Sequence, residues 1–84
     1  MSTVTAANLH IVPGYSWIVI DPALLAGQPT ILGTRISVAH ILESLAGGVP
    51  IDEIVEDYGV PREAIPEALK FAASLASEPR RVAS

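Results

Sequence analysis

Residues 38–72 read VAHILESLAGGVPIDEIVEDYGVPREAIPEALKFA, and this stretch decides the fold. In its first part, apolar side chains recur three and four residues apart, which is the spacing of one helix face, at Val38, Ile41, Leu42 and Leu45. Ser37 precedes this run and is a favoured N-cap residue, while Gly47 and Gly48 follow it and favour a stop. The pattern predicts a first helix that ends before Gly47.

The same spacing predicts a second and a third helix. The second carries its apolar residues at Ile51, Ile54, Val55 and Tyr58. Gly59 favours the left-handed conformation that commonly closes a helix. Pro61 suits the first position of a third helix, whose apolar face would consist of Ile65, Ala68, Leu69, Ala72 and Leu75. Pro66 lies inside that pattern and predicts either a kink near Ile65 or a turn over residues 61–64 followed by a helix that starts at Pro66.

Two short helices joined by a glycine-containing turn are typical of a helix-turn-helix motif. The side chains expected to wedge between the helices are Ile54, Tyr58, Val60, Ile65 and Ala68. An ordinary helical hairpin with no role in nucleic-acid binding shows the same spacing, so both interpretations stay open. If DNA is bound, the third helix would present to the major groove Arg62, Glu63, Glu67 and Lys70. Two of these side chains are acidic and repel phosphate, so we expect a modest DNA affinity.

Ahead of the helices, residues 17–36 contain short runs of β-branched residues separated by glycine and proline, which predict a small β element. Two strands alone are marginal in water, so we expect this element to pair with a second copy of the chain. The polar start of the chain is broken by Pro13-Gly14 and predicts a mobile arm. We therefore expect an arm over residues 1–16, one domain over residues 17–77 and a flexible tail over residues 78–84.

The composition limits the function classes. A chain of 84 residues has room for one hydrophobic core. It contains no cysteine, which excludes disulfides and thiolate zinc sites. The sequence carries no signal-peptide pattern and no apolar run of membrane-spanning length, so we expect a cytoplasmic protein that does not enter the membrane. The net charge of −4, with five basic residues, opposes sequence-independent binding to nucleic-acid phosphates.

One segment superficially resembles a phosphate-binding loop. Gly27 and Gly33 stand where such a loop has glycines, but five residues separate them, and Pro29 lacks an N–H donor. We expect the two glycines to allow backbone turns instead, and we expect Arg35 to pair with a carboxylate such as Asp21. The segment therefore does not predict a nucleotide cofactor.

Titratable side chains gather in no catalytic or metal-binding pattern. His10 and His40 have no metal-ligand partner at helical spacing. The acidic residues of the second helix are spread around it and read as a solvated face; they are Asp52, Glu53, Glu56 and Asp57. Tyr15 and Trp17 are candidates for a partner-binding anchor, although Trp17 equally suits the small core. The sequence thus predicts a binding protein and not an enzyme, with no metal and no cofactor.

Four motifs cover most of the chain. They are Gly27-x-Pro29-x-Ile31-x-Gly33-Thr34-Arg35-Ile36-x-Val38, Ile41-Leu42-x-x-Leu45-x-x-Gly48, Ile54-x-x-x-Tyr58 and Ile65-x-x-Ala68-Leu69-x-Phe71-Ala72. With these motifs the chain resembles the domain-of-unknown-function family 433 (DUF433), a group of small antitoxin-like bacterial proteins, from about Ile18 to Ala73. Two prolines depart from the family pattern: Pro50, where members often have a serine or threonine cap, and Pro66 within the third helix.

The resemblance implies a mainly α fold, a three-helix homeodomain-like or winged helix-turn-helix domain with a short N-terminal β element, commonly a homodimer. It also implies an antitoxin of a type II toxin-antitoxin system, which neutralises a PIN-like ribonuclease toxin while the pair binds operator DNA and represses its own transcription. Such a ribonuclease gathers carboxylates around a divalent metal, and an inserted cation would block it. Our candidates for toxin binding are Arg80, Arg81, Trp17 and Tyr15. A stand-alone DNA-binding regulator and a dimeric adaptor without DNA binding stay open as alternatives.

Overall fold

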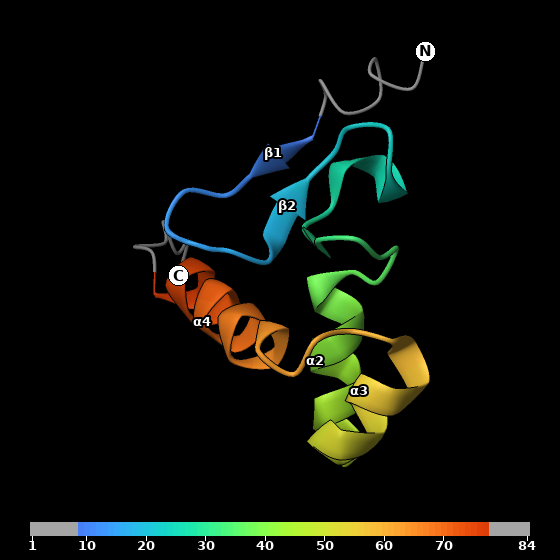
Figure 1. Ribbon diagram of the computed structural model, residues 1–84. Helices are drawn as coiled ribbons and strands as arrows, with labels where there is room; N and C mark the ends of the chain where they lie inside the picture. The colour runs from blue at the N-terminus through green and yellow to red at the C-terminus, as the bar shows by residue number, and fades with distance from the viewer. Residues whose placement is uncertain (1–8, 78–84) are drawn as a thin grey trace.

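The computed structural model describes residues 9–77, which form a small antiparallel sheet followed by three α-helices (Figure 1). The strands are β1 (His10–Ile11), β2 (Ile18–Ile20) and β3 (Thr30–Ile31). The helices are α2 (Val38–Ala46), α3 (Ile51–Tyr58) and α4 (Ala64–Ala76), and a short 3-10 helix, η1 (Leu25–Gly27), joins β2 to β3. The expected succession of a short β element and three helices is confirmed. None of the helices within residues 9–77 combines the length and the apolar character needed to cross a bilayer.

The central strand of the sheet is β2, with β1 on one side and β3 on the other. The paired residues are His10–Ile20, Ile11–Val19, Ile18–Ile31 and Val19–Thr30. The turn at Pro13-Gly14 folds β1 back onto β2, and the N–H of Tyr15 closes it by donating to the carbonyl of Val12 at 3.0 Å. The expectation of a mobile arm over residues 1–16 is therefore wrong from His10 onward.

The connection between β3 and α2 is a closed turn. The N–H of Ile31 donates to the carbonyl of Ile36 at 2.9 Å, and Gly33 takes the left-handed conformation, with φ of 82°, that the turn requires. The Thr34 hydroxyl donates to the Ile31 carbonyl at 2.8 Å and accepts from the Ile36 N–H at 3.0 Å. Residues 35 and 36, the last short run of the predicted β element, lie outside β3 after this turn.

Asp21 forms a hydrogen bond with the backbone and no ion pair with Arg35. Its side chain is buried, and one oxygen accepts the N–H of Ala23 at 2.9 Å, which fixes the turn after β2. Among residues 9–77 the one ion pair joins Arg62 to Asp52. The expected pairing of Arg35 with Asp21 is therefore wrong, because the carboxylate is engaged by its own turn.

The helices α2 and α3 begin and end where their sequence signals predict. Ser37 caps α2 by accepting the N–H of His40 at 2.9 Å, and Gly47 follows its last residue. Gly59 ends α3 in the left-handed conformation, with φ of 68°, and its N–H donates to the Val55 carbonyl. The start of α2 and the ends of both helices therefore follow local signals, as expected, whereas α3 begins after Pro50 without a side-chain capping hydrogen bond.

Pro66 does not kink the third helix. A turn over Pro61 to Glu63 precedes α4, with the Ala64 N–H donating to the Pro61 carbonyl at 3.0 Å, and the helix begins at Ala64. Pro66 therefore lies in the first turn, where a backbone N–H has no partner within the helix. Neither alternative from the sequence is fully right, because α4 starts after the expected turn but two residues before Pro66.

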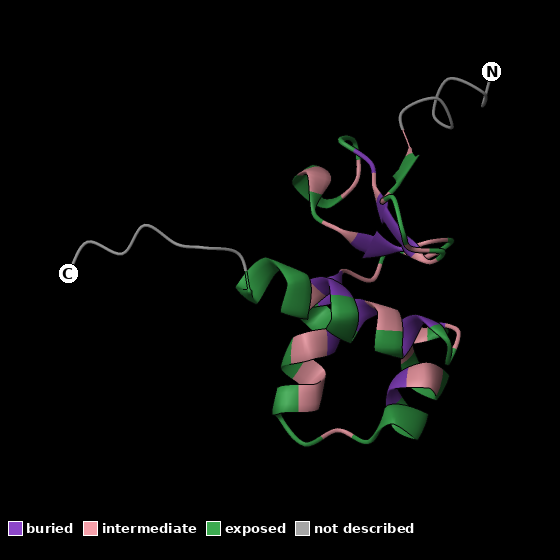
Figure 2. Cartoon of the chain, turned by 90° about the vertical axis from the view of Figure 1, so that its left-hand side faces the viewer, coloured by how far each residue is buried: buried purple, intermediate pink, exposed green. Residues whose placement is uncertain are grey.

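The core lies where α4 packs against both α2 and β2. Figure 2 shows its buried residues on the inner faces of the sheet and helices. They are Ile18, Ile31, Val38, Ile41, Ile54, Val60, Ala64, Ile65, Ala68 and Phe71. Four of the five expected wedge residues are fully buried, and Tyr58 packs against them partly exposed. On α4, however, Leu69 and Leu75 are 44% and 48% exposed, so the expected apolar face is only partly covered.

Candidate partner-binding surface

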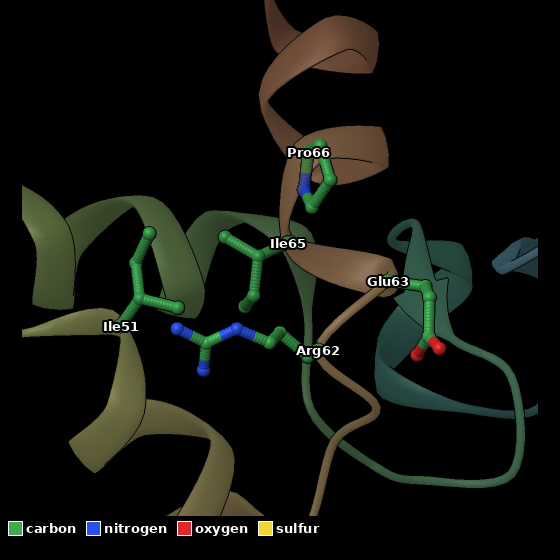
Figure 3. Close-up of a pocket in the computed structure, with 5 residues that line it drawn as sticks. All are labelled: Ile51, Arg62, Glu63, Ile65 and Pro66. Atoms are coloured by element: carbon green, nitrogen blue, oxygen red, sulfur yellow. The ribbon is translucent and has the colours of Figure 1, made fainter.

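Two of the four expected DNA-facing residues, Arg62 and Glu63, line a shallow hollow at the entry to α4 (Figure 3). Its volume is about 340 Å³, and it is lined by Ile51, Arg62, Glu63, Ile65 and Pro66. The Arg62 guanidinium reaches toward Ile51, while Glu63 points to the other side. Arg62 also forms an ion pair with Asp52 of α3. The pair is exposed, so it contributes little to stability, but it partly neutralises the charge of Arg62.

The other two candidates on α4 face the β-hairpin. The Glu67 carboxylate accepts the backbone N–H groups of Ser16, at 3.0 and 2.8 Å, and of Trp17, at 2.7 Å. The Lys70 ammonium lies over the ring of Tyr15, 5.6 Å from its centroid. The structure therefore gives both side chains an intramolecular contact that the sequence did not indicate, with Glu67 half-buried and Lys70 exposed.

Tyr15 and Trp17 attach the hairpin to the helices. Both are half-buried against the core, and the Tyr15 ring meets that of Phe71 edge to face, with 5.5 Å between centroids. Such aromatic pairs contribute about 0.5–1.5 kcal/mol beyond the burial of their area. Of the two interpretations given for Trp17, packing against the small core is the one observed. The other toxin-binding candidates, Arg80 and Arg81, lie outside the described residues.

The surface of α3 is strongly acidic. Its exposed carboxylates are Asp52, Glu53, Glu56 and Asp57. Within residues 9–77, no three His, Asp or Glu side chains come close enough together to hold a metal ion. The acidic face is thus a solvated one, and it makes the neighbourhood of α4 unfavourable for nucleic-acid phosphates.

An open apolar groove runs between α2 and the second half of α4. It has a volume of about 170 Å³ and is lined by Gln28, Pro29, Val38, Ala39, Leu42, Phe71, Ala72 and Leu75. The lining carries no charged side chain, and Leu75 stands half exposed at its edge. The sequence places Leu42, Ala72 and Leu75 on expected core faces, so it gave no sign that a groove would stay open. Its lining includes the short side chains of Ala39 and Ala72, which fill little of the space between the helices.

A second hollow lies on the other side of the N-terminal part of α2. It has a volume of about 290 Å³ and is lined by Leu25, Arg35, Ile36, Ser37 and His40. The ring of His40 rests against that of Tyr58, 4.9 Å between centroids, and the Tyr58 hydroxyl is hydrogen-bonded to that of Ser44 at 2.7 Å. The sequence placed Arg35 in a structural motif and His40 on a surface. The structure brings the two side chains to one cavity.

The remaining motif residues shape the backbone around these hollows. Gly27 and Gly33 have φ of 81° and 82°, a conformation that side chains disfavour. The carbonyl of Pro29 accepts the N–H of Val38 at 2.9 Å and so ties the loop to the start of α2. Together with the Thr34 turn, these contacts hold Arg35 between η1 and α2.

These motif residues lie within the part of the chain that a family model matches. The family model described as "Protein of unknown function (DUF433)" matches residues 18–72. The chain belongs to the DUF433 family. The resemblance proposed from the four motifs is therefore confirmed.

Two proteins of Mycobacterium tuberculosis are similar to this DUF433 chain. The uncharacterized protein Rv2308 is 35% identical over 64 residues, which cover 76% of the chain and 27% of that protein. A crystal structure of Rv2018 superposes with a TM-score of 0.58 at 23% identity, over 80% of the chain and 37% of that structure. The likeness to Rv2018 shows the fold alone. The chain spans about a quarter of the length of Rv2308 and just over a third of the solved Rv2018 chain.

Proposed function

We propose that this chain is the antitoxin of a type II toxin-antitoxin pair and that its apolar groove between α2 and α4 binds the toxin, a PIN-like ribonuclease. The observation that carries the proposal is the groove itself: uncharged, open, and edged by a half-exposed leucine. Exposed apolar patches with a polar surround commonly mark protein interfaces. The family resemblance supplies the class of partner.

Burial of the groove would supply useful binding energy. Leu75, at its edge, exposes 48% of its surface, and covering this exposed part contributes roughly 1 kcal/mol. The small side chains of Ala39 and Ala72 let a partner approach the backbone of both helices. A partner helix or strand seated there would bury several apolar side chains without desolvating a charge of this chain.

Two arginines follow the groove in the sequence. Arg80 and Arg81 come five and six residues after Leu75, which lines the groove. In this proposal they contact the partner that covers Leu75. In this proposal the groove holds the ribonuclease, and a tail arginine enters its carboxylate cluster in place of the metal.

Operator binding, in this proposal, belongs to the toxin-antitoxin complex. In the turn before α4, Arg62 is paired with Asp52, and on α4 Glu67 accepts hydrogen bonds from the hairpin backbone. The neighbouring helix α3 carries four exposed carboxylates. A stand-alone regulator would need to overcome this charge. We expect the chain alone not to shift its upstream DNA in a mobility assay at physiological salt, and the complex to shift it. A tight shift by the chain alone would favour the regulator instead.

The neutralisation proposal is tested with the full chain and the protein that co-purifies with it from the source cells, identified by mass spectrometry. We expect a small metal-dependent ribonuclease whose cleavage of single-stranded RNA stops near equimolar chain. The double variant R80A/R81A should restore cleavage, whereas R62A, at a basic residue paired elsewhere, should not. A ribonuclease that the wild-type chain leaves fully active would refute the antitoxin role. Inhibition unchanged by R80A/R81A would remove the tail from the mechanism.

The competing hypothesis is that the same groove is covered by a second copy of the chain, in a homodimer that has no further partner. Light scattering on the purified chain, with and without the co-purifying protein, separates the two. A dimer that the partner does not dissociate or bind, together with failure of the cleavage assay, would favour the adaptor function.

A further inference from the structure

The hollow beside the start of α2 combines cationic and apolar side chains. Arg35 and His40 supply the polar lining, and Leu25 and Ile36 supply the apolar one. Within the described chain Arg35 has no ion-pair partner, because the one pair there joins Arg62 to Asp52. The Arg35 guanidinium is therefore an exposed cation next to apolar side chains, in a chain whose net charge is −4.

The backbone that brings Leu25 to this hollow is strained. Leu25 and Ala26 have φ of 51° and 57°, in the left-handed region that costs a residue with a side chain about 1–2 kcal/mol. Leu25 is 40% exposed, so this strained turn leaves part of an apolar side chain open to solvent. Residues with a strained backbone cluster at active sites and ligand-binding sites, where the surrounding structure holds them in place.

His40 contributes its exposed ring to the hollow. The ring rests against that of Tyr58, whose hydroxyl is hydrogen-bonded to that of Ser44, and this contact restricts the orientation of the imidazole. The Ser37 hydroxyl is engaged as the cap of α2. The groups left to meet a ligand are therefore the guanidinium of Arg35, the imidazole of His40 and the apolar surface of Leu25.

We propose that this hollow binds a carboxylate side chain of the protein partner, with an apolar neighbour of that carboxylate packed on Leu25. The guanidinium accommodates a carboxylate in a bidentate manner, and His40 offers a further donor. A nucleic-acid phosphate fits less well, because the chain is acidic overall and the cation is flanked by Leu25 and Ile36. Ala39, on the apolar groove, and His40, on this hollow, are consecutive residues of α2 that point in different directions, so a partner that wraps around the start of this helix can contact both.

This inference rests on the proposed function for the kind of partner, but its test uses no nuclease. The full chain, labelled with ¹⁵N, is titrated with acetyl-leucyl-glutamate amide and, as the neutral match, acetyl-leucyl-glutamine amide. We expect saturable shifts of the Arg35 side-chain and His40 backbone signals with the acidic peptide. An exposed ion pair contributes at most about 1 kcal/mol, so the neutral peptide should bind severalfold, up to about fivefold, less tightly.

Variants and a second ligand make the result decisive. R35Q should abolish the preference for the acidic peptide, and R62Q, at the paired arginine, should keep it. Equal shifts with both peptides, or a preference that survives R35Q, would overturn the proposal. Inorganic phosphate binding at the same signals as tightly as the acidic peptide would overturn it in favour of a phosphate site. Because no toxin is involved, success here with failure of the cleavage assay refutes only the antitoxin role, and the reverse refutes only this site.

Discussion

Replacing Glu67 should detach the β-hairpin from α4. Its carboxylate accepts two backbone N–H groups, from Ser16 and Trp17, and the contact with Trp17 is part-buried. A hydrogen bond to a charged group contributes about 1.5–3 kcal/mol, and the exposed one of this pair lies at or below the low end. We therefore expect E67A to lower the free energy of unfolding by about 2 kcal/mol, a large share of the roughly 4–13 kcal/mol typical of a chain this long.

The assay is urea unfolding followed by Trp17 fluorescence and by helical circular dichroism. Trp17 is the one tryptophan and lies next to the contact that is lost. E67Q keeps an acceptor oxygen but not the charge, so it should lose about half as much. The matched control is E63A, which removes an exposed carboxylate at the start of the same helix that makes no capping hydrogen bond. If E67A and E63A unfold at the same urea concentration, Glu67 does not hold the hairpin, and the reasoning is refuted.

Two further substitutions test local features. A26G should stabilise the fold by about 0.5 kcal/mol, because it relieves a left-handed residue but adds chain entropy in the unfolded state, whereas A73G on exposed α4 should destabilise it by about 1 kcal/mol. Equal losses in urea unfolding for both would show that residue 26 is not strained. Y58F should cost about 0.5–1.5 kcal/mol through loss of the hydroxyl pair with Ser44. In the S44A background, adding Y58F should lower the free energy of unfolding by clearly less. An equal loss in both backgrounds would contradict the hydrogen bond between the two hydroxyls.

The helix boundaries set by local chemistry were predictable from the sequence. Ser37, Gly47 and Gly59 act on the backbone within one turn, so each signal is complete in a few residues. The start of α4 was predicted only roughly. There the Pro61 turn and Pro66 offered two plausible starting points, and the packing of Ala64 and Ile65 into the core decided between them.

The contacts that shape the candidate surface were not predictable in the same way. β1 has two exposed residues and no local pattern, and its pairing depends on β2 lying nearby. Glu67 meets residues about fifty positions earlier, a contact that helical spacing does not reveal. The groove and the Arg35 hollow arise from how α2, α4 and η1 pack, and only the folded chain brings their residues together.

The most direct measurement is the affinity of the ribonuclease that co-purifies with this chain for two variants of the chain, each with one added negative charge. Ala39 is exposed and lines the groove, while Ala73 is exposed on α4 and does not line it. Burying an unpaired carboxylate costs several kcal/mol, so calorimetric titration should show A39E binding at least about thirtyfold more weakly than wild type, and A73E binding unchanged. Equal dissociation constants for all three chains would show that the toxin binds elsewhere and that the groove is not its site.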